Sequence, residues 1–210
     1  MKIAVIGATG KAGRNILQEV LERGHHATAI VRDKTKLTVS ASDVIEKDVF
    51  ALTSDDLKSF DVVVNAFGAP FGKEYLHVDA GNVLIDALKH TDTRLLVVGG
   101  AGSLFVDEAK TTKVVDTPGF PKEVLPTATN QAKNLEILQN TKDLNWTFIS
   151  PSAIFALGKR TGNYTLGTDQ LLINAKGKSY VSYEDFAVAV LDEIEHPKHK
   201  NMRFTVGSEE

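Results

Sequence analysis

The chain of 210 residues contains no cysteine, which excludes disulfide bonds, cysteine nucleophiles and thiolate metal sites. The six histidines are dispersed, and only His25-His26 and His196-x-x-His199 bring two imidazoles close together in the sequence. Both pairs lie in predicted turns, away from any regular arrangement of ligands. We therefore expect no metal site, and a metal-dependent hydrolase is disfavoured.

The sequence also lacks an excess of charge and a long apolar run. Its formal net charge is -3, so nothing in its electrostatics favours nucleic acid or an anionic membrane as a partner. No hydrophobic stretch approaches membrane-spanning length, and the first residues lack the pattern of a signal peptide. We expect a cytoplasmic protein with no membrane partner, either a monomer or a homodimer.

Strand-like and helix-like segments alternate along the first two-thirds of the chain. Apolar, β-branched runs predict strands, and apolar positions three or four residues apart predict helices between them. Strands are predicted at 3–6, 26–31, 44–45, 61–66, 95–98, 146–149 and 202–206, and helices at 11–23, 75–89, 127–140 and 183–195. This alternation predicts an α/β protein with a doubly wound parallel sheet.

A glycine-rich turn joins the first predicted strand to the first helix. Gly7, Gly10 and Gly13 permit a tight bend and a close approach of backbone N–H groups to a pyrophosphate at the helix N-terminus. The turn also contains Thr9, Lys11 and Ala12. A P-loop is disfavoured because Ala12 follows Lys11, where that motif has Ser or Thr. The pattern predicts a dinucleotide-binding site in a Rossmann fold.

The end of the second strand bears on the choice of dinucleotide. Arg32 stands where an acidic residue takes the adenosine ribose in NAD sites, and a guanidinium there suits the 2′-phosphate of NADP. We therefore expect NADP(H); NAD(H) stays a less favoured alternative, because Asp33 at the same turn could still reach the ribose. Other candidate cofactor-binding residues follow the third, fourth and fifth strands: Asp48, Val49, Ala66, Phe67, Gly68 and Gly99. Asp48 could accept a hydrogen bond from adenine, although these are also ordinary residues for strand ends.

Several motifs together resemble a known family. Gly7-Ala8-Thr9-Gly10 with Gly13, Val31-Arg32, Lys47-Asp48-Val49 and the run from Val98 to Ser103 are similar to atypical short-chain dehydrogenases/reductases. The nearest branch is the NmrA-like NAD(P)H-binding group, which includes NADH-flavin reductases and biliverdin reductase B. The resemblance spans essentially the whole chain. It implies one NAD(P)-binding Rossmann domain over 1–210, in which we expect 151–182 and 196–210 to form a small substrate lobe.

The chain departs from the wider superfamily at its catalytic motif. Where active members carry Tyr-x-x-x-Lys, the matching segment is Thr129-Asn130-Gln131-Ala132-Lys133. A threonine hydroxyl cannot titrate as a tyrosine does, which disfavours alcohol dehydrogenase and epimerase chemistry. Lys133 and Ser103 remain candidate catalytic residues, although each could equally be an ordinary helix or turn residue.

Hydride transfer to a flavin needs no strong protein acid. We therefore predict an NADPH-dependent reductase of a small-molecule acceptor: a flavin, a quinone-like molecule or a tetrapyrrole. A flavin would be a substrate rather than a bound cofactor. The alternative is a non-enzymatic NADP(H)-binding redox sensor of the NmrA type. We expect some of six aromatic residues to form the walls of the acceptor pocket, and residues 104–126 to form a mobile lid. The six are Phe67, Phe71, Phe105, Phe120, Phe155 and Tyr164.

Overall fold

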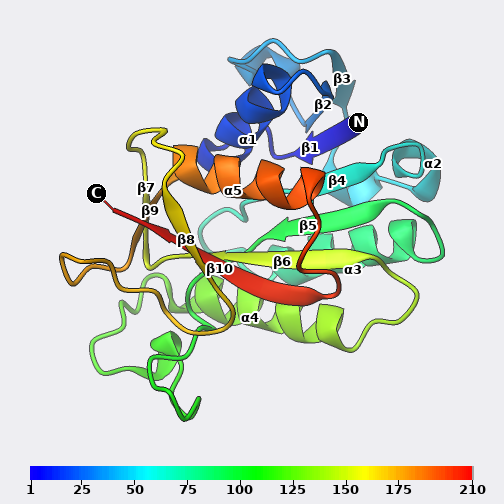
Figure 1. Ribbon diagram of the computed structural model, residues 1–210. Helices are drawn as coiled ribbons and strands as arrows, with labels where there is room; N and C mark the ends of the chain where they lie inside the picture. Colours follow the sequence, from blue (N-terminus) through cyan, green and yellow to red (C-terminus); the bar gives the residue numbers. More distant parts are fainter. Residues whose placement is uncertain (210) are drawn as a thin grey trace.

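An eight-stranded sheet forms the centre of the computed structural model, which describes residues 1–209 (Figure 1). Its strands, in spatial order, are β3 (Asp43–Glu46), β2 (His26–Val31), β1 (Lys2–Ile6), β4 (Val62–Asn65), β5 (Arg94–Val98), β6 (Trp146–Pro151), β10 (Met202–Ser208) and β8 (Tyr164–Gly167). Every neighbouring pair is parallel except β10 and β8, which run antiparallel. The predicted α/β fold with a doubly wound, mostly parallel sheet is confirmed.

Helices cover both faces of this sheet (Figure 1). One face carries α1 (Lys11–Glu22) and α5 (Tyr183–Glu195), and the other carries α3 (Leu76–Leu88) and α4 (Leu125–Gln139). The single turn α2 (Ser54–Leu57) packs beside α3. Three short 3₁₀ turns complete the helical elements of residues 1–209: η1 (Lys34–Lys36), η2 (Val49–Ala51) and η3 (Val114–Asp116). Because both faces are covered, the central strands can be apolar on both sides.

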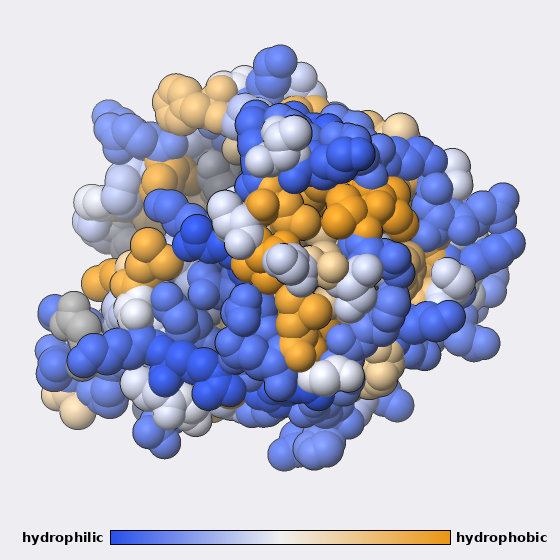
Figure 2. All heavy atoms as spheres, turned by 90° about the horizontal axis from the view of Figure 1, so that it is seen from above, coloured by the Kyte–Doolittle hydropathy of each residue, from blue (hydrophilic) through white to orange (hydrophobic). Residues whose placement is uncertain are grey.

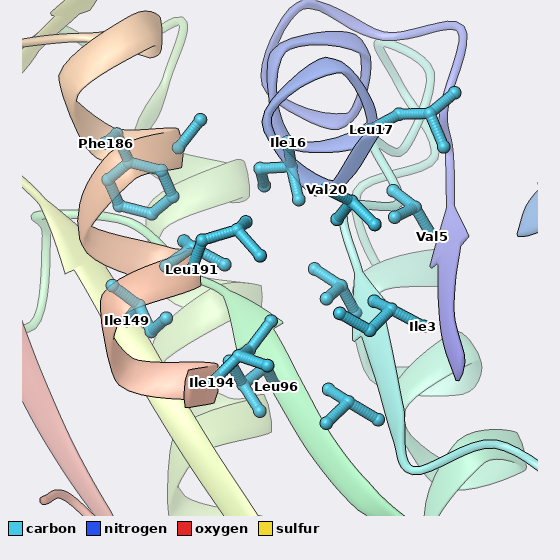
Figure 3. Close-up of a cluster of buried hydrophobic side chains, with 14 of the residues drawn as sticks. Ile3, Val5, Ile16, Leu17, Val20, Leu96, Ile149, Phe186, Leu191 and Ile194 are labelled. Carbon is cyan, nitrogen blue, oxygen red and sulfur yellow. The ribbon is translucent and has the colours of Figure 1, made fainter. Parts of the chain in front are cut away.

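The core beneath α1 and α5 shows why these helices form where they do. Ile16, Leu17 and Val20 lie on one side of α1 and are fully buried. They meet side chains from the sheet and from α5, namely Ile3, Val5, Leu96, Ile149, Phe186, Leu191 and Ile194 (Figure 3). Burying each such side chain stabilises the fold by about 1.5–3 kcal/mol. α1 then ends beside Gly24, whose φ of +76° favours glycine.

The last third of the chain contributes to two sheets. Strands β7 (Ile154–Ala156) and β9 (Tyr180–Ser182) pair in parallel beside the main sheet. We expected 196–210 to belong to a small lobe together with 151–182. In the structure, β10 instead lies inside the central sheet, between β6 and β8. Phe204 and Val206 are buried there, so this strand is part of the core.

The molecule seen from above presents α1 and the loop before β3. Apolar residues gather near the middle of this face, and hydrophilic residues surround them (Figure 2). In that loop Leu37, Val39 and Ala41 are partly buried and pack against the core cluster. None of the helices within residues 1–209 combines the length and the apolar composition that crossing a bilayer requires.

Candidate cofactor and acceptor site

A cavity of about 470 Å³ lies at the carboxyl ends of the central strands, and we call it the first cavity. Its walls include the last residues of β1, β2 and β5 and the residues that follow β4. Open α/β sheets bind ligands at this edge, where neighbouring loops diverge. Most of the cofactor residues predicted from the sequence line it: Gly7, Thr9, Gly10, Lys11, Ala12, Arg32, Val49, Ala66, Phe67, Gly68 and Gly99.

The backbone packs so closely around the glycine turn that two of its positions have no room for a side chain. Gly7 has a φ of +75°, and a Cβ there would lie 2.5 Å from the carbonyl oxygen of Ala66. A Cβ on Gly13 would lie 2.3 Å from the carbonyl oxygen of Gly7. Gly13 therefore does not line the first cavity but allows α1 to begin directly against the turn.

The N-terminus of α1 is free to bind an anion. Among the described residues no side chain caps this helix, and its first turn contains no acidic residue. Gly10, Lys11 and Ala12 line the first cavity. The N–H of Gly10 donates to the carbonyl oxygen of Gly7, but the N–H groups of Lys11 and Ala12 have no partner within the helix, so they and the positive end of the helix dipole face the cavity. This arrangement fits the pyrophosphate of a dinucleotide.

Arg32 extends the positive charge of the first cavity beyond β2. Its side chain is exposed, and it forms no hydrogen bond or ion pair with any residue in 1–209. Asp33 is already engaged, because its carboxylate accepts hydrogen bonds from the backbone N–H and hydroxyl of Thr35. These bonds, chiefly that from the Thr35 hydroxyl, lower the pKa of Asp33. Of the two residues, only Arg32 lines the first cavity.

Of the two cofactor-binding residues predicted in the loop after β3, only one lines the first cavity. Val49 lines the first cavity, but Asp48 does not; its carboxylate accepts a hydrogen bond of 3.1 Å from the N–H of Phe50 and caps η2. Lys47, which we had not singled out for cofactor binding, lines the cavity and pairs with Asp56 at 2.6 Å. The sequence signal was weak because a lysine at a strand end is usually solvated.

His77, near the start of α3, is a second lining residue that no sequence pattern indicated. Its side chain is 9% exposed, and its ring packs edge-on against Phe67 with 5.9 Å between centroids. Burial lowers the pKa of this imidazole, an effect that the carboxylate of Glu74 partly offsets. The ring forms no hydrogen bond to another described residue, so the neutral imidazole can offer one donor and one acceptor to a ligand.

Helix α4 presents a different pair of residues from the pair predicted. Thr127 and Gln131, four residues apart, face the first cavity, whereas Thr129 and Lys133 are exposed and do not line it. A shift of two residues turns a helical position by roughly 200°, to the opposite side. Gly100 lets Gln131 approach closely, since a Cβ there would lie 2.1 Å from Oε1 of the Gln131 amide.

Ser103 lies near the site without lining it. It is 8% exposed, and its hydroxyl accepts a hydrogen bond of 3.0 Å from the guanidinium of Arg203 on β10. Burial lowers the pKa of Arg203, and the nearby carboxylate of Asp169 partly opposes this. The structure thus gives Ser103 a contact that joins the loop after β5 to the central sheet.

A second cavity, of about 460 Å³, opens beside the first. We define it by the loop after β5 (Ala101 and Gly102), the segment 114–124, the start of α4 and Ala153. Thr127 and Gln131 line both cavities, so the two spaces meet at these side chains.

The six aromatic residues predicted as pocket walls are divided between different places. Phe67 and Phe155 line the first cavity, and Phe120 lines the second. Phe71 is 86% exposed, and Phe105 pairs with the backbone of 169–171. Tyr164 lines neither cavity but donates its hydroxyl to Asp192.

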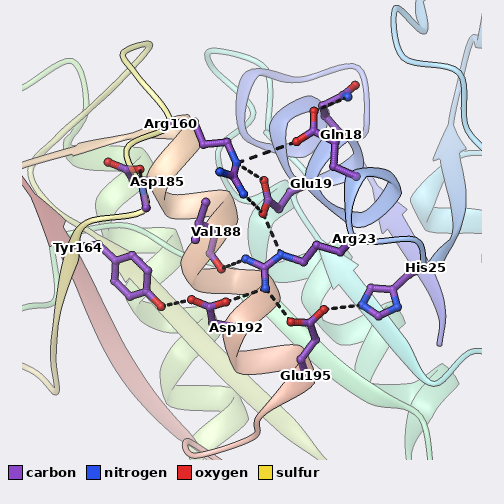
Figure 4. Close-up of polar contacts among 12 residues, drawn as sticks. Gln18, Glu19, Arg23, His25, Arg160, Tyr164, Asp185, Val188, Asp192 and Glu195 are labelled. Atoms are coloured by element: carbon purple, nitrogen blue, oxygen red, sulfur yellow. Dashed lines mark hydrogen bonds and ion pairs between the residues drawn. The ribbon is translucent and has the colours of Figure 1, made fainter.

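An ionic network fixes α1, which carries the anion site, to α5 (Figure 4). The carboxylate of Glu19 accepts hydrogen bonds from Arg23 and Arg160, with closest distances of 2.8 Å. Arg23 continues to Asp192 at 2.6 Å and Glu195 at 2.7 Å. Burial by itself raises the pKa of Glu19, but the two arginines outweigh it and leave the pKa below its ordinary value. α5 begins at Tyr183, which lines the first cavity, so the network braces two sides of the site.

Comparisons with known proteins agree with this geometry. The family model described as NAD(P)H-binding matches residues 7–197. The uncharacterized protein YwnB of Bacillus subtilis (strain 168) is 62% identical over 211 residues, covering 100% of this chain and 99% of that protein. A crystal structure from Streptococcus pneumoniae TIGR4, named "a putative NADH-flavin reductase", is 45% identical, with full coverage of both chains and a TM-score of 0.94.

A more distant structure shares the fold alone. A wide-type short-chain dehydrogenase/reductase from Veillonella parvula, solved in complex with NADP, is 16% identical with a TM-score of 0.70; the match covers 99% of this chain and 94% of that one. The full-length matches confirm the resemblance that the sequence motifs indicated. The chain belongs to the NAD(P)H-binding family.

Proposed function

We propose that this protein is an NADPH-dependent reductase that transfers a hydride to a flavin or a similar planar acceptor. The observation that carries the proposal is the junction of the two cavities at Thr127 and Gln131. A dinucleotide whose pyrophosphate lies at the N-terminus of α1 can extend toward Gly99 and this junction. An acceptor in the second cavity would then lie next to it.

Arg32 supports the choice of NADPH over NADH. It is the exposed, unpaired cation at the end of β2, and a guanidinium can bind a 2′-phosphate with two parallel hydrogen bonds. Asp33, which would favour the ribose hydroxyls of NADH, is held by Thr35.

Side chains at the junction suit hydride transfer without a strong protein acid. When bound, the reduced nicotinamide supplies a hydride, which with one proton from water converts an oxidised flavin to its dihydro form and leaves NADP⁺. Gln131 can orient the partners through its amide, and Thr127 through its hydroxyl. His77, held neutral by burial, can bond a ligand without adding charge. The relative from Streptococcus pneumoniae, named for NADH-flavin reduction, has the same fold over its full length.

The test is a titration followed by turnover. Binding of NADPH and NADH is measured by nicotinamide fluorescence, and riboflavin is then added while absorbance of the reduced nicotinamide is followed. We expect NADPH to bind more tightly and to be oxidised faster than in the protein-free mixture. Gly13→Ala, which disturbs the anion site, is the control that should lose both signals. Tight binding without oxidation would refute the reductase and indicate a redox sensor.

A further inference from the structure

We infer that the second cavity is the acceptor site and that it selects acceptors without a charged group, such as riboflavin or a quinone, over phosphorylated or carboxylated ones. This inference rests on the proposed function and names the substrate class of the same site. The sequence alone leaves flavins, quinone-like molecules and tetrapyrroles open as acceptors.

The first support is the composition of the wall. Every residue that lines the second cavity is uncharged: its side chains come from alanine, glycine, valine, proline, phenylalanine, threonine and glutamine. Phe120, Pro118 and Pro121 supply flat apolar surface on one segment. A volume of about 460 Å³ lies within the range of roughly 300–1,000 Å³ that is usual for small-molecule sites. Such a cavity favours the burial of a planar ring.

The few polar groups of the second cavity are neutral and lie near the first. The hydroxyl of Thr117 is already used, since it donates a hydrogen bond of 2.7 Å to the carbonyl oxygen of Val114. Thr127 and Gln131 form no side-chain hydrogen bond to other residues in 1–209, so they can bind the carbonyl or ring nitrogen atoms of an acceptor. The side chains that can hydrogen-bond the acceptor therefore lie where the two cavities meet, beside the edge of the acceptor that would receive the hydride.

Charged residues around the second cavity do not compensate for its neutral wall. Asp116, Lys122 and Glu123 belong to the same segment, but they are exposed and do not line the cavity. Two of these three are acidic, which gives an incoming anion no net attraction. A phosphate or carboxylate taken into the cavity would lose water without gaining a cation; among the described residues, only the N–H groups at the uncapped N-terminus of α4 would offset part of that cost.

Riboflavin and FMN provide a matched pair for the test, because they share one ring system and differ by a phosphate. Each is titrated into the NADP⁺-loaded protein while quenching of flavin fluorescence is followed, and each is then tested as the acceptor for NADPH. We expect riboflavin to bind about tenfold or more tightly, and to show a kcat/KM higher by a similar factor. Equal or tighter binding of FMN would overturn the inference and leave the proposed function intact.

A lysine substitution can supply the positive charge that the wall of the second cavity lacks. Val124 lines the second cavity and is 47% exposed, so Val124→Lys can place an ammonium group at the cavity with little damage to the core. We expect the preference to shift toward FMN by about two- to fivefold. Thr129→Lys adds the same charge on the exposed side of α4, where it lines neither cavity, and should leave the preference unchanged.

The outcomes separate the two proposals. Preferential riboflavin binding without NADPH oxidation would refute the reductase but support the selectivity of the second cavity. Failure of both flavins to bind would overturn the inference. An equal shift in both lysine variants would also contradict it, because the effect would then come from net charge rather than from this cavity.

Discussion

Replacement of Arg32 by alanine should separate the two nicotinamide cofactors. The guanidinium is exposed at the first cavity and has no internal partner among residues 1–209, so its removal breaks no contact of the fold. A hydrogen bond to a charged group contributes about 1.5–3 kcal/mol. NADPH should therefore bind roughly 10- to 150-fold more weakly to Arg32→Ala. NADH presents a hydroxyl instead of a phosphate and should lose less than about threefold.

The assay is a pair of fluorescence titrations of each protein, with NADPH and with NADH, at two salt concentrations. Added salt should weaken NADPH binding to the wild type more than to Arg32→Ala, because the lost contact is partly exposed and therefore screened. Lys34→Ala is the matched control. Lys34 is also a cation near the end of β2, but it lies 3.4 Å from Glu46 and does not line the first cavity.

Equal losses for NADPH and NADH in Arg32→Ala would refute this reasoning. The same holds if Lys34→Ala reproduced the effect, since a diffuse positive field would then replace the specific phosphate contact.

Three further predictions concern the turn, the ionic network and the buried imidazole. Gly13→Ala forces a Cβ against the backbone of Gly7 and should lower the free energy of unfolding by about 1–3 kcal/mol in urea titrations. Gly68→Ala, where a Cβ meets open space, should stay near wild type, and equal losses in both would contradict the steric argument. Glu19→Gln should lower the free energy of unfolding by about 1.5–3 kcal/mol at neutral pH, because the partly buried Arg23 and the exposed Arg160 lose the carboxylate that they share. Because the pKa of Glu19 is lowered, its carboxylate stabilises the folded protein at pH values above 4.5, the ordinary pKa of a glutamate, and this stabilisation is lost as the pH falls through the folded-state pKa. The difference in melting temperature between wild type and Glu19→Gln should therefore become smaller in acid. A difference that does not change with pH would count against this reasoning. His77→Gln should flatten the loss of stability as the pH falls below 6.5, because the unfolded imidazole takes up a proton that the folded one resists; unchanged slopes would refute this origin.

The sequence predicted the fold and the cofactor edge because both depend on local patterns. The strand before Gly7 and the helix after Gly10 are adjacent along the chain, so glycine spacing and apolar periodicity define them together. The parallel order of the sheet followed from the alternation of strands and helices. Arg32 could be placed at the cavity because it directly follows β2.

Residues that approach the site from distant elements were harder to predict. The Thr129–Lys133 pair was predicted by matching the Tyr-x-x-x-Lys motif of the superfamily to this segment. α4 has only a weak separation of apolar and polar faces, so its periodicity gave no sign that Thr127 and Gln131 face the cavity instead. His77 was overlooked because its burial depends on Phe67, which comes from the loop after a different strand. Neither the side of α4 that faces the cavity nor the burial of His77 can be derived from the spacing of residues within one element.

The position of β10 has a consequence for how this chain folds during synthesis. β10 lies between β6 and β8 but is synthesised after both of them. Neither β6 nor β8 can therefore complete its pairing with β10 until residue 208 has left the ribosome. Until then the N-terminal strands can assemble, while β6 presents an open, apolar edge of the kind that promotes aggregation. Nascent chains stalled before β10 should therefore be more readily cleaved by protease within 146–182 than within 2–65.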